Sequence, residues 1–274
     1  MIPVISSSPE LILVGAGPGD PELITLKAYR VLQAAAVILY DNLANTALLD
    51  MAPSSCEKIY VGKLPYGAYT PQETIHELIR EKAFALGRVV RLKGGDPFIF
   101  GRGFEEMIFA REQGIAVSYI PGISSMQAAG LSAIPLTHRA VSESIWVVTG
   151  TKKDGALSAD LRLAMKSKAT VVIYMGMKKL AEIAHAYKEE GLADTPAAII
   201  RYASLPEQQV ASGKVSELPE LAARYGLTHP AIIIIGAVAG LAAEAGIVLS
   251  NKKSHQGMSF EHPLAAKNMI RQII

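Results

Sequence analysis

Three glycine-containing segments carry the residues best suited to hold a small ligand. GAGPGD spans residues 15–20, KGGDP spans residues 93–97 and PGISS spans residues 121–125. Glycine allows backbone angles and close approaches that other residues resist, and Pro18 stiffens the first loop. Each segment follows a short apolar run that predicts a buried strand, and Asp41 ends another such run, VILY. Because the carboxyl ends of parallel strands line the ligand crevice, we expect all four features to face one cleft.

The first loop is open to a second interpretation, as a dinucleotide site. Gly15 and Gly17 form a GxG pair, and Asp41 lies where an acidic ligand of the ribose would stand. The third glycine of that motif is replaced by Asp20, however, and Pro18 would stiffen the turn that carries the pyrophosphate. The pattern therefore favours a shaped strand-to-helix turn over a nicotinamide or flavin site.

Asp96 allows two interpretations of its own. Its carboxylate could accept hydrogen bonds from a ligand, or it could cap the turn in which it lies, as Asp before Pro often does.

Short apolar runs alternate with helix-forming stretches, which predicts an α/β fold with parallel sheets. Helices are expected from Thr25 to Ala35, from a capped start at Thr70 to Leu86, and from a cap at Ser124 or Ser125 to Leu131. The expected strands are residues 11–14, 37–40, 58–61, 88–92, 116–120, 145–149, 170–175, 197–202, 208–213 and 231–236. A polar stretch after Pro135 predicts domains at residues 10–136 and 137–245. Residues 246–274 are expected to form a tail, either partly disordered or a short docked helix.

The composition narrows the class of protein. The 274 residues are 50% hydrophobic and 19% charged with a net charge of +2, which argues against disorder, coiled coils and nucleic-acid binding. Cys56 is the single cysteine, and the six histidines lack ligand spacing, so no metal site is expected. The uncharged run at residues 231–243 is too short to span a membrane, and the N-terminus lacks the basic region of a signal peptide. We therefore expect a cytoplasmic protein without membrane association.

Eight segments together resemble the tetrapyrrole methylase family, over about residues 11–240. They are GAGPGDPELITLKA, VILYD, VGK, RVVRLKGGDPFIFGRG, PGISS, IPLTHR, YMGM and LPEQQVASG. DPFIFGRG and IPLTHR are the specific parts, and they point to the members that methylate uroporphyrinogen III. The length predicts a methyltransferase without the dehydrogenase and ferrochelatase module that is fused to some members.

The resemblance implies two α/β domains with S-adenosylmethionine bound in the cleft between them, and a homodimer. Asp41 and Lys63 match the family's proton acceptor and proton donor. Methylation at C2 and then C7 would give precorrin-2 by way of precorrin-1. The positions that match cofactor contacts are Pro18, Gly94, Gly95, Asp96, Ile99, Ser124, Ser125, Met175 and Ala203.

The acetate and propionate groups of such a substrate require cations. Besides Lys63, the candidates are Arg102 and Arg139, with His138 beside the latter in the sequence. Each has a structural alternative, because Arg102 could pair with Glu105 or Glu106, and Arg139 could hold the domain junction.

Five positions depart from the family pattern: Asn42, Leu64, Phe104, Thr151 and Ala203. They keep open a related precorrin as substrate. A tetrapyrrole-binding protein without catalytic activity is the alternative from another functional class, and intact Asp41 and Lys63 argue against it.

Overall fold

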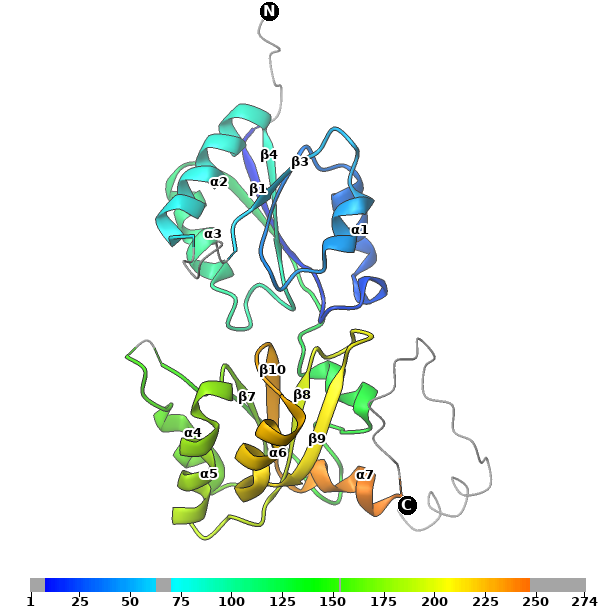
Figure 1. The fold of residues 1–274 in the computed structure, drawn as a ribbon. Coiled ribbons are helices and arrows are strands. Elements are labelled where there is room, and N and C mark those ends of the chain that lie inside the picture. Colours follow the sequence, from blue (N-terminus) through cyan, green and yellow to red (C-terminus); the bar gives the residue numbers. More distant parts are fainter. Residues whose placement is uncertain (1–7, 63–69, 153, 247–274) are drawn as a thin grey trace, which may run out of the picture.

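The computed structural model describes residues 8–62, 70–152 and 154–246, which form two α/β units stacked end to end (Figure 1). The first unit contains a five-stranded sheet of order β3-β2-β4-β1-β5. Its strands pair in parallel, as the alternation of strands and helices predicts. The bounds of the strands are Glu10–Gly15 (β1), Val37–Tyr40 (β2), Glu57–Tyr60 (β3), Arg88–Lys93 (β4) and Ala116–Ile120 (β5).

Helices cover both faces of this sheet, so the strands β1 and β2 are apolar and buried along nearly their whole length. Alternate residues such as Ile12 and Val14 pack against α1 and η2, while Leu11 and Leu13 pack toward α2 and α3. The covering helices are α1 (Leu26–Gln33), η2 (Thr46–Met51), α2 (Gln72–Leu86) and α3 (Gly103–Glu112), with the short η1 (Pro21–Leu23) after the first loop.

The second sheet has the order β6-β7-β10-β8-β9 and differs from the parallel arrangement that the sequence predicts. β6 and β7 are parallel, but β10 runs antiparallel to β7 and β8, and β8 and β9 are antiparallel neighbours. β10 lies in the middle of the sheet and runs opposite to its two neighbours, β7 and β8. The prediction of parallel strands was therefore wrong here. The strands are Ile145–Thr149 (β6), Thr170–Tyr174 (β7), Pro196–Arg201 (β8), Gln209–Lys214 (β9) and Ala231–Ile235 (β10).

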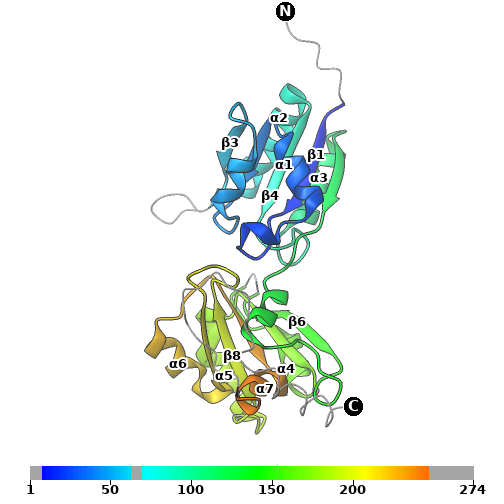
Figure 2. The ribbon, with the colours of Figure 1, turned by 90° about the vertical axis from the view of Figure 1, so that its right-hand side faces the viewer.

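Two layers also cover the second sheet (Figure 2). One is built from α4, α5 and α6, and the other contains η4 and η7. The elements are η4 (Gln127–Ser132), α4 (Ala159–Met165), η5 (Met177–Lys179), α5 (Leu180–Glu189), η6 (Val215–Glu217), α6 (Leu218–Tyr225), η7 (Ala237–Gly240) and α7 (Leu241–Glu244).

Two predicted helix starts differ in detail. The Thr70 hydroxyl donates a hydrogen bond to the Gly62 carbonyl at 2.9 Å and does not cap the helix. Pro71 occupies the N-cap of α2. The stretch after Ser125 forms the 3₁₀ helix η4 with Met126 at its N-cap, because the Ser124 hydroxyl is engaged elsewhere. η4 packs on the second sheet, so the chain leaves the first core upstream of the predicted domain boundary at 136.

Candidate functional site

The loops that follow β1, β4 and β5 meet at the edge of the first sheet that faces the second unit. Gly17 and Gly95 exchange two backbone hydrogen bonds, with N to O distances of 3.2 and 2.7 Å. The Ala16 amide donates to the Lys93 carbonyl at 2.8 Å. These bonds fix the first two glycine loops against each other.

Close backbone packing explains why glycine is required in these loops. A Cβ atom on Gly15 would lie 2.3 Å from the Gly122 nitrogen, and one on Gly122 would lie 2.2 Å from the Gly95 oxygen. Gly95 differs, because it has a φ of +65° and its Cβ position lies 3.8 Å from the nearest atom, in Ser124. Gly15 and Gly122 thus join the loops, while Gly95 leaves space beside its backbone.

Asp96 holds the turn after β4 in place. Its Oδ1 accepts from the Phe98 amide at 2.8 Å, and its Oδ2 accepts from the Tyr119 hydroxyl at 2.6 Å and the Gly122 amide at 3.1 Å. Burial, together with the bond to Asp96, raises the pKa of Tyr119. Of the two interpretations of Asp96, the structure shows the capping one, extended to a neighbouring loop, so a ligand would contact the turn and not this carboxylate.

The second unit contributes groups to the same region. The Tyr174 hydroxyl, at the end of β7, shares a hydrogen bond with the Ser124 hydroxyl at 2.7 Å and accepts one from the Met126 amide at 3.1 Å. The Asp20 amide donates to the Ser204 hydroxyl at 2.9 Å. These bonds connect loops of the first unit to strand ends of the second.

Positive φ angles at non-glycine residues concentrate in these loops. Phe100 and Arg102 follow the turn after β4, Met175 follows β7, and Tyr202 and Ser204 follow β8. Such conformations are unfavourable, and they cluster at functional sites, where packing holds them. Their location supports a ligand site between the two units.

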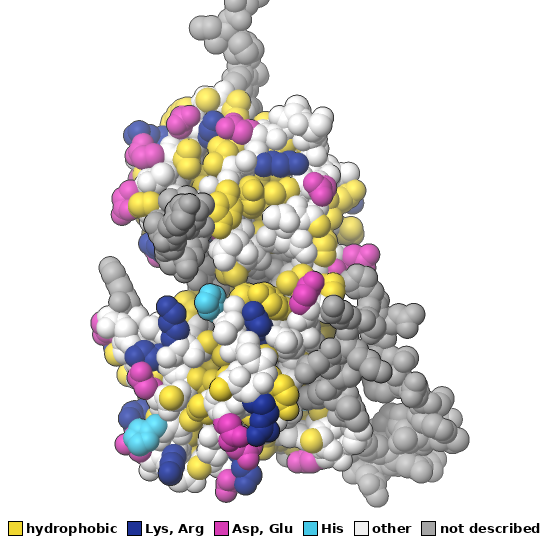
Figure 3. Space-filling model, in the orientation of Figure 1, with side chains coloured by type: hydrophobic (Ala, Val, Ile, Leu, Met, Phe, Trp, Pro, Cys, Tyr) yellow, Lys and Arg dark blue, Asp and Glu magenta, His cyan; other side chains and the backbone are white. Residues whose placement is uncertain are grey.

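Exposed apolar side chains accompany them. Leu43, Ile99, Phe100 and Met175 are all at least one-third exposed, and the Phe100 ring lies 5.3 Å from the Tyr174 ring. Hydrophobic side chains lie along the junction of the two units on the face shown in Figure 3. This surface suits a ligand with a large apolar face.

The remaining positions matched to cofactor contacts vary in accessibility. Ser124 and Ala203 are buried, whereas Pro18, Gly94 and Ser125 are half-buried. The Ala203 carbonyl and Leu205 lie close to Gly19, so this part of the chain lies against the GAGPGD loop.

Asp41 lies at the end of β2, on the same edge of the sheet. Its Oδ2 accepts from Arg91 Nη2 at 3.2 Å, its Oδ1 accepts from the Leu43 amide at 3.1 Å, and its side chain is 19% exposed. The other predicted catalytic residue, Lys63, and the predicted tail from residue 247 onward lie outside the described residues.

Sequence reasoning missed the charged groups behind Asp41. Arg91, Lys93 and Glu106 are buried, and both cations pair with the Glu106 carboxylate. The available signal was the presence of Arg91 and Lys93 in the interior of the strand RVVRLK, since buried charges need partners.

The three candidate substrate-binding residues occupy two places. Arg102 pairs with Glu105, which raises the pKa of its exposed guanidinium, and it lies beside the turn after β4. His138 and Ser142 form a tight turn, and the Ser142 hydroxyl shares a hydrogen bond with the hydroxyl of Thr170 at the start of β7. Met175 follows the other end of that strand. Within one chain the structure does not bring His138 and Arg139 together with Arg102.

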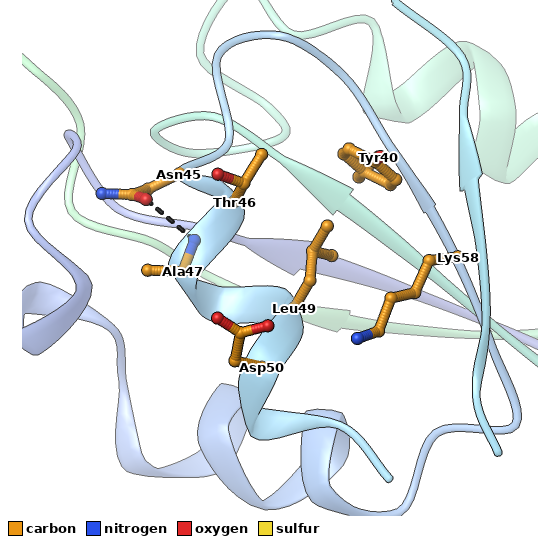
Figure 4. A pocket seen from close by; sticks show the side chains of 7 residues that line it. All are labelled: Tyr40, Asn45, Thr46, Ala47, Leu49, Asp50 and Lys58. Carbon is orange, nitrogen blue, oxygen red and sulfur yellow. Dashed lines mark hydrogen bonds between the residues drawn. The ribbon is translucent and has the colours of Figure 1, made fainter. Parts of the chain in front are cut away.

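Two hollows lie beside these features. One of about 440 Å³ lies between η2 and strands β2 and β3, and it is lined by Tyr40, Asn45, Thr46, Ala47, Leu49, Asp50 and Lys58 (Figure 4). Asn45 bounds it and also donates to the Gly19 carbonyl at 2.8 Å. The other, of about 390 Å³, includes Arg139 and Lys168. The matched cofactor positions line neither hollow.

Within the described part of the chain there is no group of three His, Cys, Asp or Glu side chains that could hold a metal ion. The helices described there are too short or too polar to cross a membrane.

Comparison with known families identifies the family of the chain. Residues 10–219 match the model of the family described as Tetrapyrrole (Corrin/Porphyrin) Methylases. The chain belongs to the tetrapyrrole methylases. Its siroheme synthase relatives from Chromobacterium violaceum and Thiobacillus denitrificans are both 44% identical, over 84% and 85% of this chain. This methylase spans about half the length of those curated relatives, 49% in each case.

Solved structures agree with the family assignment. The uroporphyrin-III C-methyl transferase of Thermus thermophilus, crystallised with S-adenosyl homocysteine, is 39% identical, with a TM-score of 0.74. The match covers 85% of this methylase and 99% of that chain. A cobalt precorrin-4 methyltransferase shares the fold, with a TM-score of 0.75 at 23% identity. The predicted class, α/β with the tetrapyrrole methylase fold, is confirmed.

Proposed function

We propose that this methylase transfers methyl groups from S-adenosylmethionine to C2 and then C7 of uroporphyrinogen III, giving precorrin-2 for sirohaem or cobalamin synthesis. The observation that carries the proposal is the site itself: glycine turns, an apolar surface and Asp41 meet at one edge of the first sheet. The likeness to the Thermus thermophilus enzyme supports the choice of substrate.

The residues between the two units fit S-adenosylmethionine. There is room for a Cβ atom beside Gly95, and Ile99 and Met175 are exposed apolar side chains. Pro18, Gly94, Gly95, Asp96, Ile99, Ser124, Ser125, Met175 and Ala203 would hold the molecule, with the turn of Asp96 contributing through its backbone. When bound, S-adenosylmethionine supplies a methyl group that its sulfonium already activates.

The protein's own task is to align the macrocycle and to move protons. A pyrrole carbon gains the methyl group as the carbon–sulfur bond breaks, and the macrocycle then loses a proton. In this proposal Asp41, which is half-buried and held by Arg91, accepts that proton. Leu43 and Phe100 would cover the apolar face of the ring, since exclusion of water strengthens interactions in such a site.

Arg102 is the proposed partner of the substrate carboxylates. It is exposed, and its present partner Glu105 is a neighbouring surface side chain, so exchange for a substrate carboxylate costs little. His138 and Arg139 lie at the far end of β7, and a contact with the same substrate molecule has no support from one chain alone.

Anaerobic incubation with S-adenosylmethionine and uroporphyrinogen III, followed by mass spectrometry, tests the proposal. We expect a dimethylated product. Asp41→Asn should lower kcat by about 100-fold or more, since that is the usual contribution of a general base, and leave S-adenosylhomocysteine affinity unchanged. Asp50→Asn is the matched control, because Asp50 is an exposed acid of the same unit. Absence of a methylated product would refute the proposal.

The same assay separates the alternatives. Methylation of a precorrin but not of uroporphyrinogen III would identify a related methylase, for which exposed Phe104 beside the turn is the specific observation. Binding of both ligands without turnover would identify a non-catalytic binding protein. A dinucleotide enzyme is disfavoured, because the Gly17 backbone, which would approach the pyrophosphate, is bonded to Gly95, and Asp20 replaces the third glycine of the motif.

We also propose that the protein is a homodimer, as the resemblance implies. Sedimentation velocity measures this directly, and a monomer across micromolar concentrations would refute it.

A further inference from the structure

A cluster of buried charges lies behind Asp41, between strand β4 and helix α3. Arg91, Lys93 and Glu106 are 3%, 5% and 0% exposed. Burying ions is costly, and apolar side chains of similar volume often stabilise a protein as well or better. A contribution to folding stability therefore does not by itself explain why these three charges are buried together.

The contacts of Glu106 are uneven. Its Oε1 accepts from Lys93 Nζ at 3.0 Å, from Arg91 Nε at 3.3 Å and from Gln72 Nε2 at 3.3 Å. Its buried Oε2 has no hydrogen-bond partner among the described residues. The carboxylate thus collects three donors on one oxygen, a geometry that serves to hold those donors in position.

Arg91 connects this carboxylate to Asp41. Its Nε donates to Glu106 and its Nη2 to Asp41 Oδ2 at 3.2 Å. Its Nη1 donates to the carbonyls of Leu92 at 2.9 Å and Leu39 at 3.4 Å. Because the guanidinium is planar and rigid, fixing these edges also fixes the direction in which it meets Asp41.

Charge balance completes the arrangement. Two cations and two carboxylates share the space. Burial and the neighbouring Arg91 lower the pKa of Lys93, and Glu106 and Asp41 oppose this shift only in part. His76 approaches from α2, where it contacts Gln72 at 3.2 Å and stacks on Phe109 of α3. A change in any one of these charges therefore alters the field at Asp41.

We propose that Arg91, Lys93 and Glu106 are positioning residues for Asp41: they orient its carboxylate toward the cleft and set the charge around it. This inference rests on the proposed function, in which Asp41 accepts the proton that the macrocycle loses. In this inference the three buried residues act through Asp41 and do not themselves touch the substrate.

The test is the dependence of kcat/KM on pH, in Glu106→Gln and Lys93→Met. Loss of the Glu106 charge leaves the cations to act on Asp41 alone, so its carboxylate stays ionised to lower pH and is a weaker base. The acidic limb of the profile should move to lower pH, and kcat should fall about tenfold. Loss of the Lys93 charge should move the acidic limb to higher pH.

Controls separate positioning from folding. Lys93→Arg keeps the charge and should keep the limb in its original place. Glu112→Gln on α3 and Lys27→Met on α1 change exposed charges and should leave the profile unchanged. Affinity for S-adenosylhomocysteine, measured by calorimetry, should stay within about twofold of the original in every variant. If Glu106→Gln does not fold, the Lys93 pair carries the test.

The outcomes are distinct. Limbs that shift in opposite directions support the inference. A lower rate with unshifted limbs would mean that the cluster is only structural, and it would overturn the inference while the proposed function stands. If the unmodified protein makes no methylated product, both proposals fall.

Discussion

Replacement of Asp96 tests whether one carboxylate organises the site. In Asp96→Asn the Oδ1 bond to Phe98 survives, but an amide nitrogen takes the place of Oδ2. Tyr119 can rotate its hydroxyl to accept from that nitrogen, whereas the Gly122 amide is left facing another donor. Hydrogen bonds to charged groups contribute about 1.5–3 kcal/mol each, so loss of one and weakening of another should cost about 2–4 kcal/mol.

Urea unfolding measures this cost, and calorimetric titration with S-adenosylhomocysteine measures its effect on the site. We expect affinity to fall about tenfold or more, because the unpaired Gly122 amide displaces the loop that packs on Gly95. Tyr119→Phe removes only the 2.6 Å bond and should show a smaller loss of both quantities. Asp160→Asn, at an exposed acid, is the control. An Asp96→Asn protein with unchanged stability and affinity would refute this account of the loops.

Three further outcomes follow from the packing. Gly122→Ala places a methyl group 2.2 Å from a backbone oxygen and should prevent stable folding, while Gly130→Ala, with open space around it, should match the original in urea unfolding. Tyr174→Phe loses the hydrogen bonds of Tyr174 with Ser124 and Met126, and it should lower the free energy of unfolding by about 1–3 kcal/mol and weaken S-adenosylhomocysteine binding; unchanged values would show that these two bonds do not stabilise the protein or its site. Burial raises the pKa of Tyr187 above its usual 10.0, so stability is fully present below about pH 10 and should fall as pH rises further, because the unfolded chain ionises first. Tyr187→Phe should reduce that fall by up to about 1.4 kcal/mol per pH unit, and an identical pH dependence in the variant would contradict this.

Apolar periodicity was sufficient to locate the strands. The predicted runs coincide with β1 to β10 to within a residue or two at each end. Buried strands in a layered fold must be apolar on both faces, so their sequences stand out without tertiary information. The direction of β10 did not follow, because an apolar run has the same composition whichever way the strand enters the sheet.

The glycine loops show the limit of motif reasoning. The sequence indicated that GAGPGD and PGISS are shaped turns at strand ends, but not what requires glycine there. The reason is a three-way backbone contact among Gly15, Gly95 and Gly122, which are far apart in the chain. Asp96 follows the same pattern, since two of its three donors come from β5 and the loop beyond it.

The sequence alone predicted that Asp41 follows a buried strand, because that strand is short, apolar and followed by a polar turn, and the structure places it directly after β2. What surrounds Asp41 was decided by tertiary structure. Glu106 lies fifteen residues from Arg91 in the chain, and only the packing of α3 on β4 brings the two together. The sequence thus determines which segments are buried and which residues end them. The partners of a buried charge depend on how the covering helices pack against the sheet.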